Sequence, residues 1–117
     1  MDSILTSIKK LIGIAEEYEH FDDDLILQIN TVFMTLKQLG VGPSDGFEIQ
    51  NDSATWNDYI DVKKEPDKLT LLSAVKTYIH LKVKMIFDPP LNGSVAESIK
   101  QTISELEWRL NHEIETK

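Results

Sequence analysis

The residues that could support catalysis or metal binding are three histidines, an acidic run, a glycine-rich turn and two nearby glutamates. His20, His80 and His112 lie far apart in the sequence, and none forms the paired spacing of a zinc-binding helix such as HExxH. The chain has no cysteine, so a zinc site would need carboxylate ligands beside these histidines. We therefore predict no metal site.

Carboxylates are the next candidates, because calcium sites and general acid–base pairs are built from them. Asp22, Asp23 and Asp24 lack the spaced oxygens and terminal glutamate of a calcium loop, whereas carboxylates in the first turn of a helix are stabilised by its dipole. Glu105 and Glu107 are two positions apart, so they point to different faces of a helix. We interpret the aspartates as a helix start and the glutamates as solvated charges.

The glycine-rich stretch GVGPSDG, at residues 40–46, does not fit a phosphate-binding loop. It lacks the Lys-Ser/Thr ending and the preceding strand of that motif, and its glycines and proline instead predict a turn. We therefore expect no catalytic residues, no cofactor and no enzymatic activity. An enzyme with an unrecognised pocket is a rival interpretation, although no set of convergent polar groups can be named for it.

Composition and charge limit the kind of protein that positions these residues. With 117 residues, 41% of them hydrophobic and 27% charged, the chain has the composition of one folded domain, which we predict spans residues 1–117. No apolar run reaches the roughly 20 residues needed to span a bilayer, so we expect no membrane partner. A formal charge of -8 argues against gripping DNA, because nucleic-acid binders rely on Lys and Arg.

Apolar residues at helical spacing predict an all-α fold, a small bundle of about four main helices. Asp22 is expected to cap the second helix, with Phe21 packing on Ile26 as a hydrophobic staple, and Pro66 suits the start of the third. Between those two helices the periodicity disappears, and the residues FEI form at most a brief extended segment. We predict the helices at residues 3–12, 22–39, 66–87 and 94–115, with an irregular region at 40–65.

The helix expected at residues 66–87 carries two apolar seams, which together cover more than one face. Such a helix either lies at the centre of a bundle or leaves one seam for another chain, and we favour the centre. One seam is Leu72, Val75, Ile79, Val83 and Ile86, and the other is Leu71, Ala74, Tyr78, Leu81 and Met85.

Three large aromatic residues each admit two interpretations. Ser53 is expected to cap a short helix that carries Trp56 and Tyr59 on one side. These two rings either close one end of the core or anchor a neighbouring subunit, since exposed aromatics are favoured at interfaces. Trp108, beside Arg109, lies off the apolar stripe of the last helix and either leans over the core edge or contacts a partner.

The stretch FDPPLNG, at residues 87–93, predicts a stiff corner between the last two helices. The residue before a proline is pushed out of helical geometry, the second proline fixes another φ angle, and Asn-Gly is a strong turn signal. The last helix is expected to begin with a capping box of Ser94 and Glu97. The corner residues are Asp88, Pro89, Pro90, Asn92 and Gly93, and the stripe that follows is Val95, Ile99, Ile103, Leu106, Leu110 and Ile114.

Several stretches carry a family resemblance in their order along the chain: ILTSIKKLIGI, FDDDLILQINTVFMTLKQLGVGP, GFEI, TWNDYI, VKTYIHLKVKMIFDPP and ISELEWRLN. The most distinctive parts are QLGVGP at residues 38–43, Trp56, and LKVKMIFDPP at residues 81–90. From Ile4 to Asn111 the chain resembles the head-tail connector proteins, also called adaptor or head completion proteins, of long-tailed bacteriophages and prophages. None of these stretches is a catalytic motif, so the resemblance rests on structural signatures.

The resemblance implies an α-helical structural protein of the virion, located at the head-tail joint and in the host cytoplasm during assembly. Its copies are expected to form a ring of about twelvefold symmetry beneath the portal protein after DNA packaging. That ring would be the platform on which the stopper, or tail-completion protein, and the tail dock. Genomic DNA would pass through the ring without specific binding.

The resemblance also implies where the contacts lie. Residues 107–117 would face the portal, and the region between the second and third helices would face neighbouring subunits or the next ring. A ring needs two different patches on each subunit. We expect portal contacts from Trp108, Arg109, Asn111, His112 and Ile114, and subunit contacts from Trp56, Tyr59, Leu71, Tyr78 and Met85.

An acidic regulatory protein is the alternative function, such as a phage inhibitor that mimics DNA by presenting carboxylates to a basic partner. This function predicts carboxylates spaced along one surface. The acidic pattern is interrupted by Lys9, Lys10, Lys63, Lys64, Lys82 and Lys84.

Overall fold

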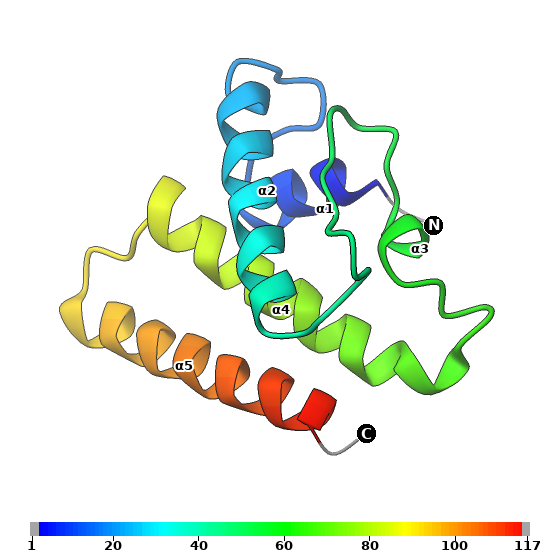
Figure 1. Cartoon of the computed structure of the whole chain (residues 1–117). Coiled ribbons are helices and arrows are strands. Elements are labelled where there is room, and N and C mark those ends of the chain that lie inside the picture. The colour runs from blue at the N-terminus through cyan, green and yellow to red at the C-terminus, as the bar shows by residue number, and fades with distance from the viewer. Residues whose placement is uncertain (1–2, 116–117) are drawn as a thin grey trace.

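A computed structural model describes residues 3–115, and the side chains of residues 3–112, as an arrangement of helices (Figure 1). Within residues 3–115 there is no β-strand, and the single β-bridge joins Ser3 to Thr55. The predicted all-α fold with four main helices is therefore confirmed. The elements are α1 (Ile4–Leu11), α2 (Asp22–Gln38), α3 (Trp56–Tyr59), the 3₁₀ turn η1 (Pro66–Lys68), α4 (Leu69–Phe87) and α5 (Gly93–Glu115).

α4 lies at the centre of the molecule, with α2 on one side and α5 on the other (Figure 1). It also contacts α1, so it is packed from three directions. Both predicted seams supply buried residues: Leu72, Val75, Ile79 and Val83 from the first, and Leu71 and Tyr78 from the second. Burying such side chains stabilises a fold by about 1.5–3 kcal/mol each, so α4 organises the core. The predicted central position is confirmed.

α5 runs back along α4 after the corner and packs on it with the predicted stripe. Leu110 is buried, Ile103 and Leu106 are partly buried, and Val95 is exposed near the start of the helix. Tyr78 of α4 donates a hydrogen bond of 2.7 Å to Oε2 of Glu107 of α5. Burial, and secondarily this contact with a carboxylate, raises the pKa of Tyr78, so its hydroxyl stays a donor.

Several helix starts differ from the sequence expectations. α3 is capped by Thr55 rather than Ser53, because the side chain of Thr55 forms a capping box with Asp58. α5 is capped by Asn92 rather than Ser94, since Oδ1 of Asn92 accepts a hydrogen bond of 2.8 Å from the Ser94 N–H. In both cases the cap is the residue that the local backbone places beside the free N–H groups, not the serine that the sequence spacing predicted.

Two further corrections concern the second and third predicted helices. Phe21 occupies the cap position of α2 without a side-chain cap bond, and Asp22 lies inside the helix. Pro66 begins a 3₁₀ turn, and the α-helix follows only from Leu69. At α1 the cap is Ser3, whose Oγ accepts a hydrogen bond from the Thr6 N–H at 3.2 Å.

The irregular region at residues 40–65 packs against the helices instead of forming a strand. The side chain of Asn30, in α2, accepts from the N–H of Ile49 at 2.8 Å and donates to its carbonyl at 2.9 Å. This amide therefore replaces the pairing that a strand would need at the expected extended segment. Nearby, the rings of Phe33, Phe47 and Tyr59 lie 4.7–5.2 Å apart and close this side of the core.

Lys9, in α1, is buried, with 2% of its surface exposed. Its Nζ donates to the carbonyl oxygens of Glu16 at 2.8 Å and Tyr18 at 2.7 Å, and lies 2.8 Å from Oδ1 of Asp22. The two carbonyls take two of the three N–H donors of the lysine, and the carboxylate of Asp22 balances its charge. Because an unpaired buried charge is costly, this arrangement requires the segment at residues 13–21 to fold over α1. Lys9 thus anchors the connection between α1 and α2.

Replacing Lys9 by methionine leaves two carbonyl oxygens and one carboxylate without their cation. We expect Lys9→Met to lower the free energy of unfolding by about 2–4 kcal/mol, measured by chemical denaturation. The exposed neighbour Lys10 supplies the control, and Lys10→Met is expected to change stability by no more than about 0.5 kcal/mol. Equal stabilities of the two variants would contradict the anchoring role of Lys9.

Gly42 adopts a φ angle of +91°, and a Cβ built on it would fall 2.7 Å from Cε1 and from Oη of Tyr59. The Tyr59 ring is buried, which raises the pKa of its hydroxyl. Only glycine meets both requirements, the positive φ and the close approach of the ring. This glycine lets the turn after α2 close against the core.

Gly13 provides a matched control for Gly42, because it has a φ angle of +86° and no atom lies within 4 Å of the position that a Cβ would take. Gly13→Ala is expected to cost about 1 kcal/mol for the backbone conformation alone. Gly42→Ala is expected to cost about 1–3 kcal/mol more, because the methyl group overpacks the Tyr59 ring. Denaturant titrations of both variants measure the difference, and indistinguishable midpoints would refute the close packing.

Candidate interaction surfaces

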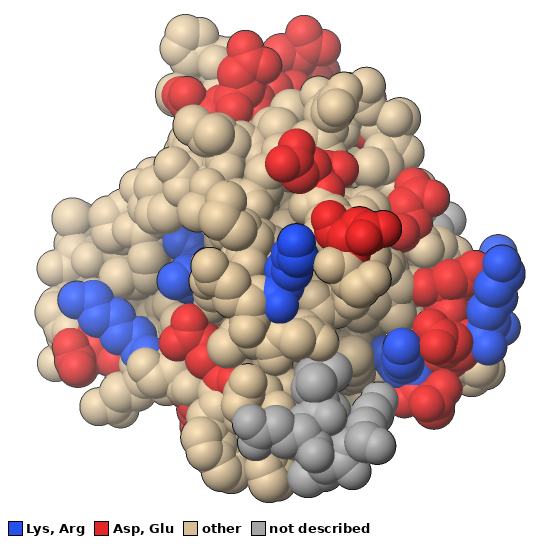
Figure 2. Space-filling view, viewed as in Figure 1, with Lys and Arg blue, Asp and Glu red and all other residues tan. Residues whose placement is uncertain are grey.

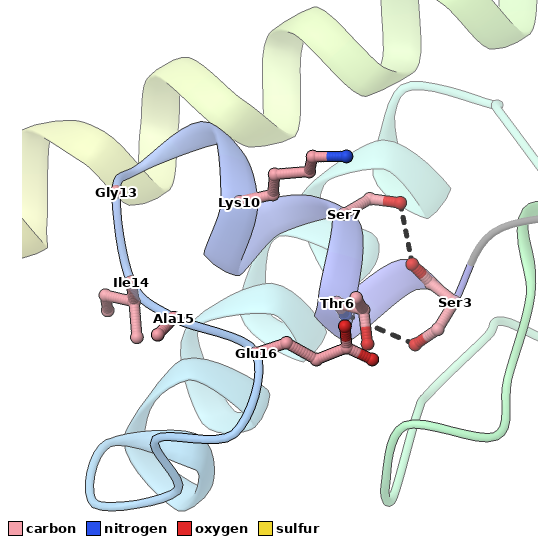
Figure 3. A pocket seen from close by; sticks show the side chains of 8 residues that line it. All are labelled: Ser3, Thr6, Ser7, Lys10, Gly13, Ile14, Ala15 and Glu16. Carbon is pink, nitrogen blue, oxygen red and sulfur yellow. Dashed lines mark hydrogen bonds between the residues drawn. The ribbon is translucent and has the colours of Figure 1, made fainter.

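A hollow of about 750 Å³ lies beside α1. Its lining comes from α1 and from the segment that follows it (Figure 3). Oγ of Ser7 donates to the Ser3 carbonyl at 2.7 Å and accepts from Nε1 of Trp56 at 3.2 Å, so both partners of this hydroxyl are structural. Figure 3 shows Lys10 and Glu16 on separate sides of the hollow, without convergence on one point. The lining residues are Ser3, Thr6, Ser7, Lys10, Gly13, Ile14, Ala15 and Glu16.

The three histidines stay apart in the fold. His20 lies in the α1–α2 connection, His112 lies in α5, and His80 lies in α4. Burial, and secondarily the charge of Lys84, lowers the pKa of His80, against the effect of a backbone contact with Leu11. In the part of the chain that the structure describes, no three His, Cys, Asp or Glu residues are grouped to hold a metal ion. The same part contains no helix long and apolar enough to cross a membrane.

Trp108, Arg109 and His112 form an exposed surface near the end of α5, here called the Trp108 face. Trp108 is 66% exposed, and its ring stacks on that of His112 with centroids 5.1 Å apart and planes at 5°. Arg109 pairs with Glu105 at 2.7 Å on the solvent side of the helix. Beside the tryptophan lies a hollow of about 290 Å³ with a mainly apolar lining: Thr70, Leu71, Ala74, Leu106, Trp108, Arg109, Leu110 and His112.

The other two residues expected to meet the portal are placed differently. Asn111 is half-buried, and its Nδ2 makes a long hydrogen bond of 3.4 Å to the Leu39 carbonyl. It therefore ties α5 to the end of α2. The side chain of Ile114 lies outside the described residues.

The residues expected to contact neighbouring subunits are mostly not on the surface. Trp56, Tyr59, Leu71 and Tyr78 are all buried in the core of the subunit, and for Trp56 and Tyr59 this burial favours the alternative, in which the two rings close one end of the core. The α4 seam that carries Leu71 and Tyr78 is covered because α1, α2 and α5 pack on α4, and the sequence of one helix does not reveal which neighbours cover it. Met85 alone remains half-exposed. It lines a hollow of about 330 Å³ with Lys82, Ile86, Lys100, Ile103 and Ser104.

The corner between α4 and α5 leaves its tip in solvent. Asp88 follows the last residue of α4 and pairs with Lys84 at 3.2 Å, and Asn92 caps α5. Pro89 and Leu91 between them are exposed. The chain reverses within these few residues, where the two prolines and the Asn-Gly pair predicted a corner.

A cluster of exposed rings escaped the sequence reasoning. Tyr18, His20 and Phe21, in the α1–α2 connection, have ring centroids 4.9–5.9 Å apart. Phe21 also meets Phe87, the last residue of α4, at 6.3 Å. We call these four residues the aromatic knob. Its sequence signal was the run EEYEHF, in which rings alternate with acids, although Phe87 could not be joined to it without the fold.

A known protein family matches nearly the whole length of the chain. A family model described as Phage connector protein matches residues 4–117. No curated protein and no solved structure gives a significant match. The match confirms the resemblance seen in the sequence, and proteins of this kind are structural connectors, not enzymes in general. The chain belongs to the phage connector protein family.

Proposed function

We propose that this protein is a head-tail connector whose copies form a ring beneath the portal protein after DNA packaging. The match of the connector family to residues 4–117 carries this proposal, because it spans all the main helices. In the proposed role the ring belongs to the virion and gives the stopper and tail a platform. The all-helical fold, with its stiff corner, suits a rigid spacer between two larger assemblies.

The Trp108 face is the proposed contact with the portal. An exposed tryptophan beside an apolar hollow is unusual on an isolated subunit, and Trp and Arg are the residue types that most often dominate binding energy. The ring of Trp108 is already held flat by stacking on His112, so little side-chain freedom is lost on binding. Leu71, Leu106 and Leu110 supply the apolar floor for a partner side chain.

The contact between neighbouring copies in the ring needs two different surfaces, and we propose Met85, which is half-exposed, for one of them. Met85 and Ile86 lie in a shallow apolar hollow, flanked by Lys82 and Lys100. This hollow is a suitable half of a head-to-tail interface. With -8 charges per chain, a ring of about twelve copies would be strongly negative, which would keep genomic DNA from adhering to its channel.

The acidic inhibitor remains the weaker function. Figure 2 shows acidic side chains gathered at the top of the face drawn, over the α1–α2 connection, whereas elsewhere Lys and Arg interrupt them. A DNA mimic needs carboxylates repeated along one surface, whereas Lys and Arg lie among the acidic groups that continue below this end of the face (Figure 2). The family match gives no support to an inhibitor.

An early stop codon in the gene, in the phage or prophage that encodes this chain, tests the proposal. We expect electron microscopy to show tailless heads that have lost DNA, beside free tails that assembled separately. Complementation with the intact gene should restore tailed virions. Tailed virions in normal numbers without the protein would refute the connector function.

Removing the exposed tryptophan tests the portal contact directly. Trp108→Ala is expected to weaken binding of the purified protein to purified portal by about tenfold or more, because a central aromatic anchor is lost. Leu27→Ala is the matched control, since Leu27 in α2 is 64% exposed and lies away from α5. Surface plasmon resonance measures both affinities. Equal affinities would move the portal contact away from this face.

A further inference from the structure

The subunit has two exposed aromatic surfaces, and they lie at opposite ends of α4. The Trp108 face borders Thr70 and Leu71, at the start of α4, whereas the aromatic knob includes Phe87, its last residue. The 19 residues of α4 separate these ends by about 27 Å. A subunit that joins two neighbours needs binding surfaces facing in different directions, and these two satisfy that requirement.

The knob has the features of a docking surface. Tyr18 is 49% exposed and Phe21 37% exposed, and both touch His20 through ring contacts. Monomeric proteins seldom leave a connected aromatic cluster in solvent, and aromatic residues are enriched in protein interfaces. The rings also hold one another in place, which reduces the side-chain entropy that a partner would have to remove.

Lys9 fixes the backbone beneath the knob. Its buried ammonium donates a hydrogen bond to the carbonyl of Tyr18. It also pairs with Asp22, the residue that follows Phe21. The connection has no regular secondary structure over most of its length, so this internal cation replaces a helix or strand as its support. The knob is therefore presented in a set conformation before any partner binds.

The charge around the rings identifies the partner's chemistry. The segment EEYEHFDDD, residues 16–24, contains no Lys or Arg. Among the ion pairs of the described residues, Asp22 is the one acid of this segment that takes part. Glu16, Glu17 and Glu19 are all exposed, and Figure 2 shows the acidic group over this end of the molecule. Arg and Lys side chains complement such a surface twice, by pairing with carboxylates and by stacking on aromatic rings.

We propose that the aromatic knob is the tail-side docking surface of the subunit. It binds a Lys- or Arg-bearing segment of the next protein between the connector and the phage tail. This inference rests on the proposed connector function and on the Trp108 face meeting the portal. The Trp108 face then binds on the head side, and the aromatic knob binds on the tail side. DNA is not the occupant, because the carboxylates repel its phosphates.

Complementation of the stop-codon phage with variants of the full chain tests this inference. The double variant Tyr18→Ser/Phe21→Ser removes the rings without changing charge, and the single variant Tyr18→Ser spares the packing of Phe21 on Phe87. Leu27→Ser is the matched control for loss of an exposed apolar side chain. Thermal unfolding of each purified variant identifies any that fails to fold, in which case the single variant decides. The measurements are the connector content of purified heads, by mass spectrometry, and the fraction of heads with tails.

The double variant is expected to yield heads that retain the connector but carry at least tenfold fewer tails, with free tails accumulating. Trp108→Ala should instead yield heads without the connector. A charge variant, Glu16→Gln/Glu17→Gln/Glu19→Gln, is expected to reduce tail joining as well, because it removes carboxylates that pair with the basic partner. This variant leaves Asp22 and its ion pair with Lys9 intact.

Three results would overturn the inference. Normal tail joining by the ring variants would remove the knob from the tail-side interface. Heads that lack the connector would show that the knob contacts the portal or a neighbouring copy instead. Tail joining unaffected by the charge variant would exclude a basic partner. Failure of the connector function itself is distinguishable, because the stop codon alone would then leave tailed virions in normal numbers.

Discussion

The fold depends on the burial of α4 from several directions at once. Its two apolar seams cover too much of the helix surface to be satisfied by one neighbour, so α1, α2 and α5 must all pack on it. This requirement sets the layered order of the molecule, with α2 and α5 on opposite sides of α4 (Figure 1). It also consumes Leu71 and Tyr78, which in an isolated helix would serve equally well as contacts for another chain.

Polar groups complete what apolar packing leaves undefined. The helices are joined by two connections with little regular structure, and each is held from within by one side chain: Lys9 holds the α1–α2 connection, and Asn30 holds the region before α3. A buried ammonium or amide is stable only when its hydrogen bonds are satisfied, so each of them admits few backbone paths. Tyr78 acts similarly between α4 and α5, where its hydroxyl binds Glu107. The connections are consequently shaped, although they lack helices and strands.

These supports give the subunit a polarity that suits a connector. Two groups of exposed aromatic side chains lie near helix ends, with Trp108 near the end of α5 and the aromatic knob at the end of α4. The long helices lie between these ends, and the corner between α4 and α5 is restrained by prolines and by the Asn92 cap. The acidic run lies at the second of these ends, whereas at the first Arg109 is paired with Glu105.

The sequence alone determined the helices, because apolar spacing reports which side chains must leave water: α2, α4 and α5 begin and end within a few residues of their predicted bounds. It also located the corner at residues 88–93, through proline and Asn-Gly chemistry that acts within a few bonds. Spacing did not decide between competing caps, so Thr55 and Asn92 displaced the expected Ser53 and Ser94. Only the tertiary structure decided which aromatic rings are exposed: it buried Trp56 and Tyr59 and brought Phe21 against Phe87 at the surface. The physical reason is that burial depends on contacts between residues distant in the chain, whereas helix formation depends mainly on neighbours within one or two turns.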